Sequence, residues 1–357
     1  MTSIKSHLNT GAWAKPAVFQ KNTSLFNTSW CGPLLLAALV GGCGGGGRDP
    51  VLGIGNGSAG APILVAPPGS VNPGGGSITP VPPVTPVPPV TPVPPVIPVP
   101  PVIPVIPAIA LGSASTFGSF GGSAGVTNMG INTIINGDIG TTAVSTSVTG
   151  FHDAGPGCIY TETPLNVGTV NGKIYTAPPS PTAACPSEGT AVTFAIATRA
   201  RADALVAYNA LEAMPGGPNP GAGNLANLVL APGVYTAASG AFIIQGGSLT
   251  LDAQGNANAV WVFQMPTSLT VGGPGAAFPS SIILANNAQA KNVFWQVGST
   301  AIINAGGGGT MAGTIISQAG VVFSTAGAAS ILTLNGRAVS LGASVTMVNT
   351  VINVPAP

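Results

Sequence analysis

Charged side chains are scarce in this sequence. Asp, Glu, Lys and Arg make up 5% of the 357 residues, against roughly 25% in an ordinary soluble protein. The net charge is +1, and no block of basic residues follows Arg48. The chain therefore lacks the clustered Lys and Arg that neutralise the phosphates of a nucleic acid, and we expect no nucleic-acid partner.

Residues that carry out acid–base or nucleophilic chemistry are also few. The chain has 2 histidines and 8 acidic residues, and it contains no GxSxG motif. A pair of carboxylates for glycoside cleavage would have to come from Asp138, Asp252 or the predicted helix, and no spacing selects them. We therefore predict that the protein is not an enzyme and binds no cofactor or metal.

No run of 18 apolar residues occurs, so no segment is predicted to span a membrane as a helix. The N-terminus instead has a basic segment followed by the apolar residues 33–40. Val40-Gly41-Gly42-Cys43 is similar to a bacterial lipobox, which predicts a lipoprotein signal peptide over residues 1–42 and acylation of Cys43. The alternative is an ordinary secretory signal with an incidental cysteine. We expect an exported protein held at the outer membrane or cell surface by its lipid, or else secreted.

The chain has 4 cysteines. Cys31 lies in the predicted signal peptide and Cys43 is the predicted lipid site, which leaves Cys158 and Cys185. Two cysteines in an exported domain predict a disulfide, worth roughly 3–4 kcal/mol on the chain-entropy model. A metal site is the competing interpretation, but two thiols and one remaining histidine, His152, are a poor set of ligands.

A long linker separates the signal peptide from the folded domain. Residues 43–78 are rich in Gly, Ser, Asn and Pro, which predicts a flexible segment. Residues 79–107 repeat the pattern TPVPPV, which favours a stiff polyproline II stalk of about 90 Å. The alternative interpretation of this proline-rich repeat is a docking ligand for SH3-like domains. The domain is predicted to occupy residues 108–357.

Short apolar runs broken by Gly, Asn and Pro dominate the domain, and the stretch 249–298 shows them best. Residues 260–265 and 293–297 are apolar on both sides of a strand, which predicts strands buried on both faces. We therefore expect a coil of short strands in which each turn of the coil, or rung, packs on the preceding one. Residues 152–189 contain both cysteines, much Pro, Gly and Thr, and little periodicity.

One amphipathic helix is predicted over residues 190–214. Its start can be capped by Ser187 or Thr190, and Pro215 with two glycines ends it. The apolar stripe that we expect to pack on the coil, at helical spacing, consists of Ala197, Ala204, Leu205, Tyr208 and Leu211.

Four segments together resemble the bacterial and fungal ice-binding proteins with an irregular β-solenoid: residues 135–140 (INGDIG), 230–235 (LAPGVY), 249–265 (LTLDAQGNANAVWVFQM) and 286–299 (NNAQAKNVFWQVGS). They occur in the family's order within residues 108–354. The resemblance implies a mainly β fold, a right-handed β-helix of triangular section with a long helix alongside. It also implies a flat face that binds ice, and a small disulfide-closed capping region over residues 152–189 that covers one end of the coil.

The last third of the chain is nearly uncharged and rich in Thr, Ser, Ala and Gly, as a surface for an extended ice lattice would need to be. The family's ice face commonly repeats a Thr-Ala/Gly-x-Thr/Asn step, which this chain matches in part. The predicted ice-contact residues are Thr270, Thr300, Ser324, Thr325 and Thr346. We expect a monomer whose partner is the ice crystal surface. The alternative is a structural or adhesive surface lipoprotein with the same fold and no ice affinity.

Overall fold

The computed structural model describes residues 80, 82, 83, 106–273, 279–325 and 327–356. The chain divides into two units, Met1–Thr91 and Pro92–Pro357, and the folded domain lies in the second. The predicted signal peptide and lipid site, and nearly all of the predicted linker and stalk, lie outside the described residues. Within the described part, no helix is long and apolar enough to cross a membrane.

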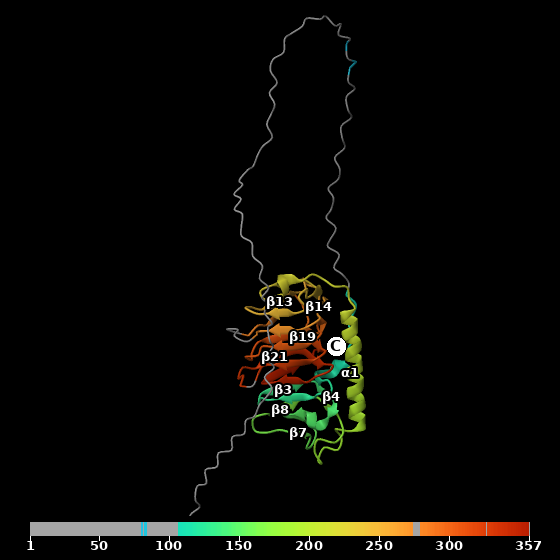
Figure 1. The fold of residues 1–357 in the computed structure, drawn as a ribbon, viewed down its shortest axis with the longest axis vertical. Coiled ribbons are helices and arrows are strands. Elements are labelled where there is room, and N and C mark those ends of the chain that lie inside the picture. The colour runs from blue at the N-terminus through green and yellow to red at the C-terminus, as the bar shows by residue number, and fades with distance from the viewer. Residues whose placement is uncertain (1–79, 81, 84–105, 274–278, 326, 357) are drawn as a thin grey trace, which may run out of the picture. The chain divides into compact units, whose positions relative to one another are not determined.

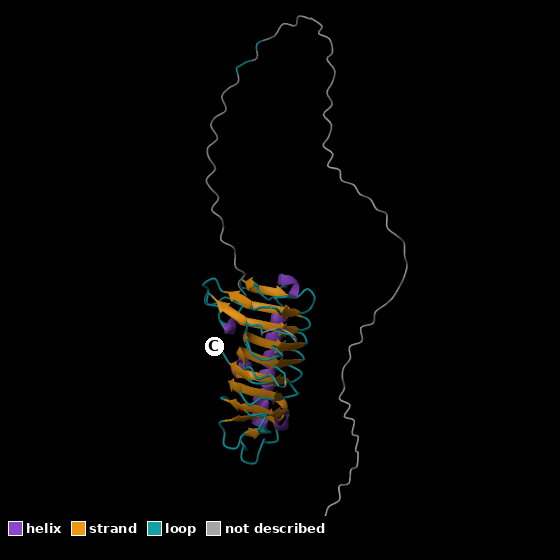
Figure 2. Ribbon diagram, turned by 90° about the vertical axis from the view of Figure 1, so that its left-hand side faces the viewer, coloured by secondary structure: helices purple, strands orange, loops and turns teal. Residues whose placement is uncertain are grey.

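The domain is mainly β and its strands form three sheets (Figures 1 and 2). The seven-stranded sheet has the order β12 (Phe242–Ile244), β15 (Leu269–Val271), β18 (Thr300–Ile303), β20 (Gly320–Phe323), β22 (Val345–Met347), β2 (Val126–Asn128) and β5 (Val148–Thr149). A three-stranded sheet contains β10 (Val229–Leu230), β13 (Leu249–Asp252) and β16 (Ile282–Ala285).

The third sheet has thirteen strands. Ten follow one another in the order β11 (Gly233–Thr236), β14 (Trp261–Met265), β17 (Val293–Val297), β19 (Thr310–Ser317), β21 (Leu332–Ser340), β23 (Thr350–Asn353), β3 (Thr133–Asn136), β8 (Gly168–Val170), β6 (Phe151–Asp153) and β7 (Ile159–Tyr160). Alongside lie β1 (Phe117–Gly121), β4 (Asp138–Val144) and β9 (Ile174–Ala177), with β1 paired to both β21 and β4. All of these strand pairings are parallel except that of β6 with β7.

The strands β14 and β17 are buried on both sides, as their sequence predicts. Trp261, Phe263 and Met265 point into the interior between the sheets, and Val262 points toward the helix. Both faces of this sheet are covered, which explains why the run lacks the polar alternation of a half-exposed strand.

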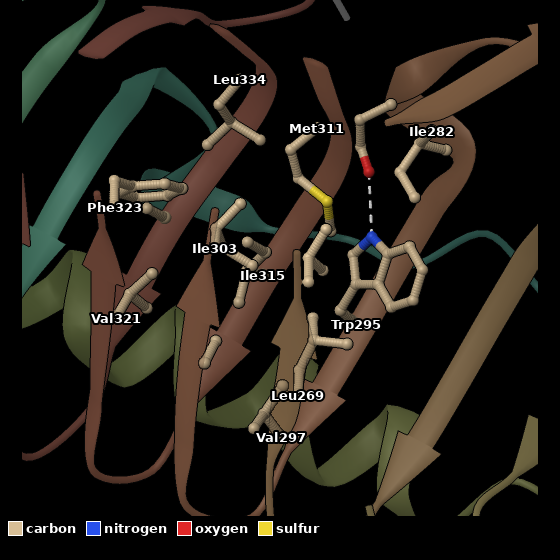
Figure 3. Packing of buried hydrophobic residues seen from close by; sticks show 14 of the residues in the cluster. Leu269, Ile282, Trp295, Val297, Ile303, Met311, Ile315, Val321, Phe323 and Leu334 are labelled. Atoms are coloured by element: carbon tan, nitrogen blue, oxygen red, sulfur yellow. Dashed lines mark hydrogen bonds between the residues drawn. The ribbon is translucent and has the colours of Figure 1, made fainter. Parts of the chain in front are cut away.

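Stacked aromatic rings run through the interior across successive strands. The ring centroids of Phe263 and Trp295 lie 4.1 Å apart, and those of Phe263 and Tyr235 lie 5.5 Å apart. The indole Nε1 of Trp295 donates to the carbonyl oxygen of Ala312 at 2.9 Å (Figure 3). This bond satisfies the one polar group of a fully buried ring, so the large apolar side chain is retained in the interior without an unpaired donor.

The two ends of the domain sequence meet in the middle of the sheets. β2 pairs with β22, β1 pairs with β21, and β3 pairs with β23. The prediction that each rung covers the preceding one is therefore wrong at this junction, where N-terminal strands continue the stack left by the C-terminal ones. Periodicity marks each strand but carries no information about which neighbour it takes, because parallel pairing here is long-range.

The helix α1 (Ala191–Glu212) runs alongside the stacked strands (Figures 1 and 2). Thr190 caps it through two reciprocal hydrogen bonds: the Thr190 hydroxyl accepts from the Thr193 backbone N–H at 3.2 Å, and the Thr193 hydroxyl accepts from the Thr190 backbone N–H at 2.8 Å. The buried stripe consists of Thr193, Ala197, Ala200, Ala204, Ala207, Tyr208 and Leu211. The five-residue stripe expected from the sequence is correct except at Leu205, which is 43% exposed. The alanines let the helix axis approach the sheet closely.

Short 3₁₀ segments make several of the corners: η1 (Gly112–Thr116), η2 (Ser145–Ser147), η3 (Pro220–Gly223) and η4 (Ala290–Asn292). The predicted disulfide is confirmed, and it joins Cys158 to Cys185. The region 152–189 around it does more than cover an end, because β8 pairs with β3 and β9 pairs with β4. It thus extends the thirteen-stranded sheet at the end of the domain that the disulfide closes.

Candidate functional site

The seven-stranded sheet carries one outward-facing residue from each strand in continuous register. We call this set the β-branched row, and it consists, in order across the sheet, of Ile243, Thr270, Ile302, Val322, Thr346, Thr127 and Thr149. Each member is partly exposed, and its strand neighbours are buried against the interior. The two-residue period of a strand places all seven on the outer side.

Every residue of the row is Thr, Ile or Val. Side chains branched at Cβ have restricted χ1 angles, so their methyl and hydroxyl groups are held in fixed positions relative to the backbone. Neighbouring strands lie about 4.8 Å apart, so the row repeats at that spacing over about 29 Å. None of its members is ionisable, and the row is therefore a rigid, uncharged line of methyl and hydroxyl groups.

The positions two residues before the row carry no bulky or charged side chain. In the same order across the sheet they are Ala241, Ser268, Thr300, Gly320, Ser344, Gly125 and Ser147. These side chains are too short to shield the neighbouring row, and three of them are serine. The sheet thus offers a strip of small and β-branched residues to the outside.

Glycine at position 125 is needed for the close approach of two chain segments at the edge of this strip. Gly125 has a φ of 96°, in the region that favours glycine. A Cβ at this position would overlap the backbone carbonyl of Ser147. The small residue therefore lets β2 and β5 lie side by side and brings Thr127 into register with Thr149.

The structure places the five residues predicted to contact ice in different environments. Thr270 and Thr346 are members of the row, and Thr300 lies on β18 of the same sheet. Thr325 is exposed but follows β20, and its hydroxyl donates to the Ala305 carbonyl at 2.7 Å. Ser324 is only 1% exposed and has a φ of 60°. Its prediction as a surface contact is corrected, because its hydroxyl is turned away from solvent at the corner.

Five members of the row were missed from the sequence: the apolar Ile243, Ile302 and Val322, and the threonines Thr127 and Thr149. The two threonines lie far from Thr346 in the chain and reach it only through the junction of the N- and C-terminal strands. A small residue followed by Val-Thr occurs at residues 125–127, 147–149 and 344–346, but it also occurs at residues 191–193 in α1, so the pattern alone does not select these strands. The three copies that lie in strands are adjacent in the seven-stranded sheet.

Another face of the domain carries a ladder of asparagine side chains. Asn353 donates to Asn335 at 3.0 Å, Asn136 to Asn353 at 2.7 Å, and Asn171 to Asn136 at 2.6 Å. The ladder binds the C-terminal strands to the N-terminal ones. Its first three residues belong to β21, β23 and β3, which are neighbours in the thirteen-stranded sheet.

The charged residues of the later strands lie elsewhere. Arg337 is 4% exposed, and its guanidinium donates to the Ser115 carbonyl at 2.8 Å and the Pro355 carbonyl at 3.1 Å. Burial lowers the pKa of this guanidinium. In the part of the chain that the structure describes, one group of potential metal ligands lies together, namely Cys158, Cys185 and Glu188. Its two sulfurs form the disulfide and are not free to bind a metal.

The seven-stranded sheet presents an extended, uncharged β surface, and the comparisons identify the family of the chain. The family model described as ice-binding-like matches residues 120–353. The chain belongs to this ice-binding-like family.

Its relatives come from bacteria and fungi. It is 33% identical over 215 residues to an ice-binding protein of Nostoc sp. (strain HG1), covering 60% of this chain and 64% of that protein. It is 38% identical over 115 residues to ice-binding protein 1 of Shewanella frigidimarina, covering 30% of this chain and 12% of that protein. The chain thus spans less than two thirds of the length of these curated relatives.

Solved structures of the family share the fold. The crystal structure of an ice-binding protein from the Antarctic ascomycete Antarctomyces psychrotrophicus aligns with a TM-score of 0.52 at 31% identity, covering 70% of this chain and 99% of that one. A glycosylated ice-binding protein from an Arctic yeast aligns with a TM-score of 0.53 at 28% identity, covering 70% and 95%. The share of this chain that aligns corresponds in size to its described domain.

Proposed function

We propose that this protein binds ice through the seven-stranded sheet, with the β-branched row as the centre of the contact. The observation that carries the proposal is the row itself, seven uncharged β-branched residues in register on an unbroken sheet of a family member. The domain is, in this proposal, a right-handed irregular β-solenoid of triangular section, and it acts as a monomer without enzymatic activity.

The mechanism follows from the rigidity and regularity of the strip. Charged groups bind water strongly in arrangements that do not fit a lattice, whereas fixed methyl and hydroxyl groups can order the water between them. Each pair contributes little free energy, and adsorption comes from many pairs engaged together. Thr346, Thr127 and Thr149 are consecutive in the row and form its richest cluster of hydroxyl groups.

The direct test is ice-affinity partitioning of the purified protein, with thermal hysteresis measured alongside. We expect the protein to be enriched in a slowly grown ice fraction, where a non-binding protein of similar size is excluded. Exclusion of the parent protein from ice would contradict the proposal. It would instead favour a structural or adhesive role for a surface protein with this fold.

We also propose that the protein is exported and attached to the outer membrane or cell surface by a lipid on Cys43, with the proline-rich segment holding the domain away from the membrane. The supporting observation is the sequence Val40-Gly41-Gly42-Cys43 after a short apolar segment. Expressed in a bacterium, the parent should incorporate labelled palmitate and partition into detergent, and Cys43→Ala should do neither. Absence of label from the parent would favour secretion after an ordinary signal peptide.

A further inference from the structure

Two carboxyl groups are buried together beside the disulfide. Asp153, at the end of β6, is 5% exposed, and Glu188, just before α1, is 3% exposed. One oxygen of each has a partner: Asp153 Oδ1 accepts from the Gly155 backbone N–H at 2.7 Å, and Glu188 Oε2 accepts from the Tyr160 hydroxyl at 2.7 Å. The other two oxygens, Asp153 Oδ2 and Glu188 Oε1, are buried without a hydrogen-bond donor among the described residues.

The nearest cation does not supply a hydrogen bond to either of these two oxygens. The ammonium of Lys173 lies 3.7 Å from Asp153 Oδ2 and 3.9 Å from Glu188 Oε1, and the side chain is 56% exposed. These distances exceed those of a hydrogen bond between an ammonium and a carboxylate. Both of these oxygens face the same ammonium, so the two carboxyl groups are neighbours in the buried site.

We propose that Asp153 and Glu188 share one proton, and that this carboxyl pair is a pH-sensitive contact that holds the disulfide-closed end of the domain together. A proton on one carboxyl group donates to the other and satisfies both orphaned oxygens at once. Without that proton, two negative charges face each other in a buried site, and at least one of the two oxygens lacks a donor.

The electrostatics of the site agree with this geometry. Burial, followed by the hydrogen bond with Asp153, raises the pKa of Glu188 from 4.5 to about 7, against smaller opposing effects of the Tyr160 hydroxyl and Lys173. Burial and the neighbouring Glu188 raise the pKa of Tyr160, so this hydroxyl stays protonated and remains a donor. The nearby imidazole of His152 is engaged with Glu162 at 2.6 Å. The phenol of Tyr175 has a raised pKa from burial and then from Asp138 and Glu188.

A short chain of contacts connects the carboxyl pair to the end of the seven-stranded sheet. Tyr160 donates its hydroxyl to Glu188, and its backbone carbonyl accepts from the Gly150 N–H at 2.7 Å. Gly150 directly follows Thr149, and its carbonyl accepts from the Asn128 side chain of β2 at 3.0 Å. Loss of the shared proton is therefore expected to loosen β5 and β2, which carry Thr149 and Thr127. This last consequence rests on the proposed function, whereas the proton sharing does not.

The sign of the pH dependence follows from linkage. The folded state holds a proton on Glu188 up to about pH 7, whereas the unfolded chain releases it near 4.5. The folded state therefore binds more protons in this interval, and stability falls as pH rises through it. The melting temperature of the parent should drop by on the order of 5 °C between about pH 5 and pH 8.

The variant Glu188→Gln tests this assignment, because an amide can donate to Asp153 at every pH. Its melting temperature should lack the fall seen in the parent. Asp153→Asn provides the same test if the first variant folds poorly. The control Glu162→Gln, which alters the pair with His152, should keep the parent's fall. A parent with a flat profile, or a Glu188→Gln variant with an unchanged fall, would overturn the proposal.

Two further measurements test whether loss of the shared proton also loosens β5 and β2 of the seven-stranded sheet. In the parent, the hydrogen-exchange protection factor of the Gly150 amide should decrease between about pH 6 and pH 8, and in Glu188→Gln it should stay constant. Ice uptake should decrease over the same interval in the parent alone. Equal ice uptake at both pH values, together with constant protection, would refute the link to the sheet. A parent that enters ice at neither pH would refute the proposed function and leave the stability test intact.

Discussion

Replacing Thr346 by tyrosine is expected to reduce the protein's uptake into ice by roughly tenfold, which corresponds to about 1.4 kcal/mol of adsorption free energy. Thr346 lies in the β-branched row between Val322 and Thr127. A phenol ring there would stand above the strip and separate its neighbours from the lattice. The melting temperature should barely change, because the site is partly exposed and tyrosine is as favourable as threonine in a strand.

Thr127→Tyr should have the same effect as Thr346→Tyr, although the two positions are remote in the sequence. The register pairs them directly across β2 and β22. The matched control is Thr198→Tyr, since Thr198 is an exposed threonine on α1. Thr300→Tyr on β18 should also reduce uptake, and Thr325→Tyr, beyond the end of β20, should reduce it less. If the two row variants enter ice as well as the parent, another face of the domain is the binding surface.

Replacing Tyr208 by alanine is expected to lower the free energy of unfolding by roughly 3–5 kcal/mol. Tyr208 is 3% exposed on the sheet side of α1. Its hydroxyl oxygen accepts from the Gln296 side-chain N–H at 2.6 Å. The substitution removes a large ring from the interface between helix and sheet and leaves the buried Gln296 amide without this partner. Chemical denaturation of parent and variant measures the loss.

Leu205→Ala is the control for the same helix. Leu205 is 43% exposed, so its truncation should change the free energy of unfolding by about 0.5 kcal/mol or less. A loss equal to that of Tyr208→Ala would mean that the helix packs on the sheet with a different face. The pair thus tests the docking of α1, which the sequence pattern alone assigned incorrectly at Leu205.

The error at Leu205 has a physical cause. Leu205 follows Ala204 immediately, and a step of one residue turns the side chain by about 100° around the helix. The sequence pattern placed both Ala204 and Leu205 in the buried stripe, because the helix has apolar residues on much of its circumference, including the exposed Val206. Only the tertiary contacts of α1, with η1 and with the strands β4, β9, β14 and β17, decided which stripe is buried. The cap at Thr190 was predictable because it depends on neighbouring residues alone.

Local pattern determined much of this protein without any tertiary information. Residues 261–265 and 293–297 had to form strands buried on both sides, because they consist of β-forming residues with apolar side chains on both faces of the strand. The single amphipathic helix, its cap, and the pairing of Cys158 with Cys185 were likewise readable from composition and spacing. The family motifs added the expectation of stacked parallel strands and an ice-binding face.

The arrangement of the surface was decided by the tertiary structure. Thr127 and Thr149 join Thr346 only because N-terminal strands pair with C-terminal ones, and Ser324 leaves the surface only because the chain turns at that residue. Parallel pairing between remote segments depends on which strands remain unpaired after the others have packed, and no local pattern encodes that. The sequence by itself thus determined the strands, the helix and the uncharged character of the surface, whereas the fold alone determined which threonines stand in one row.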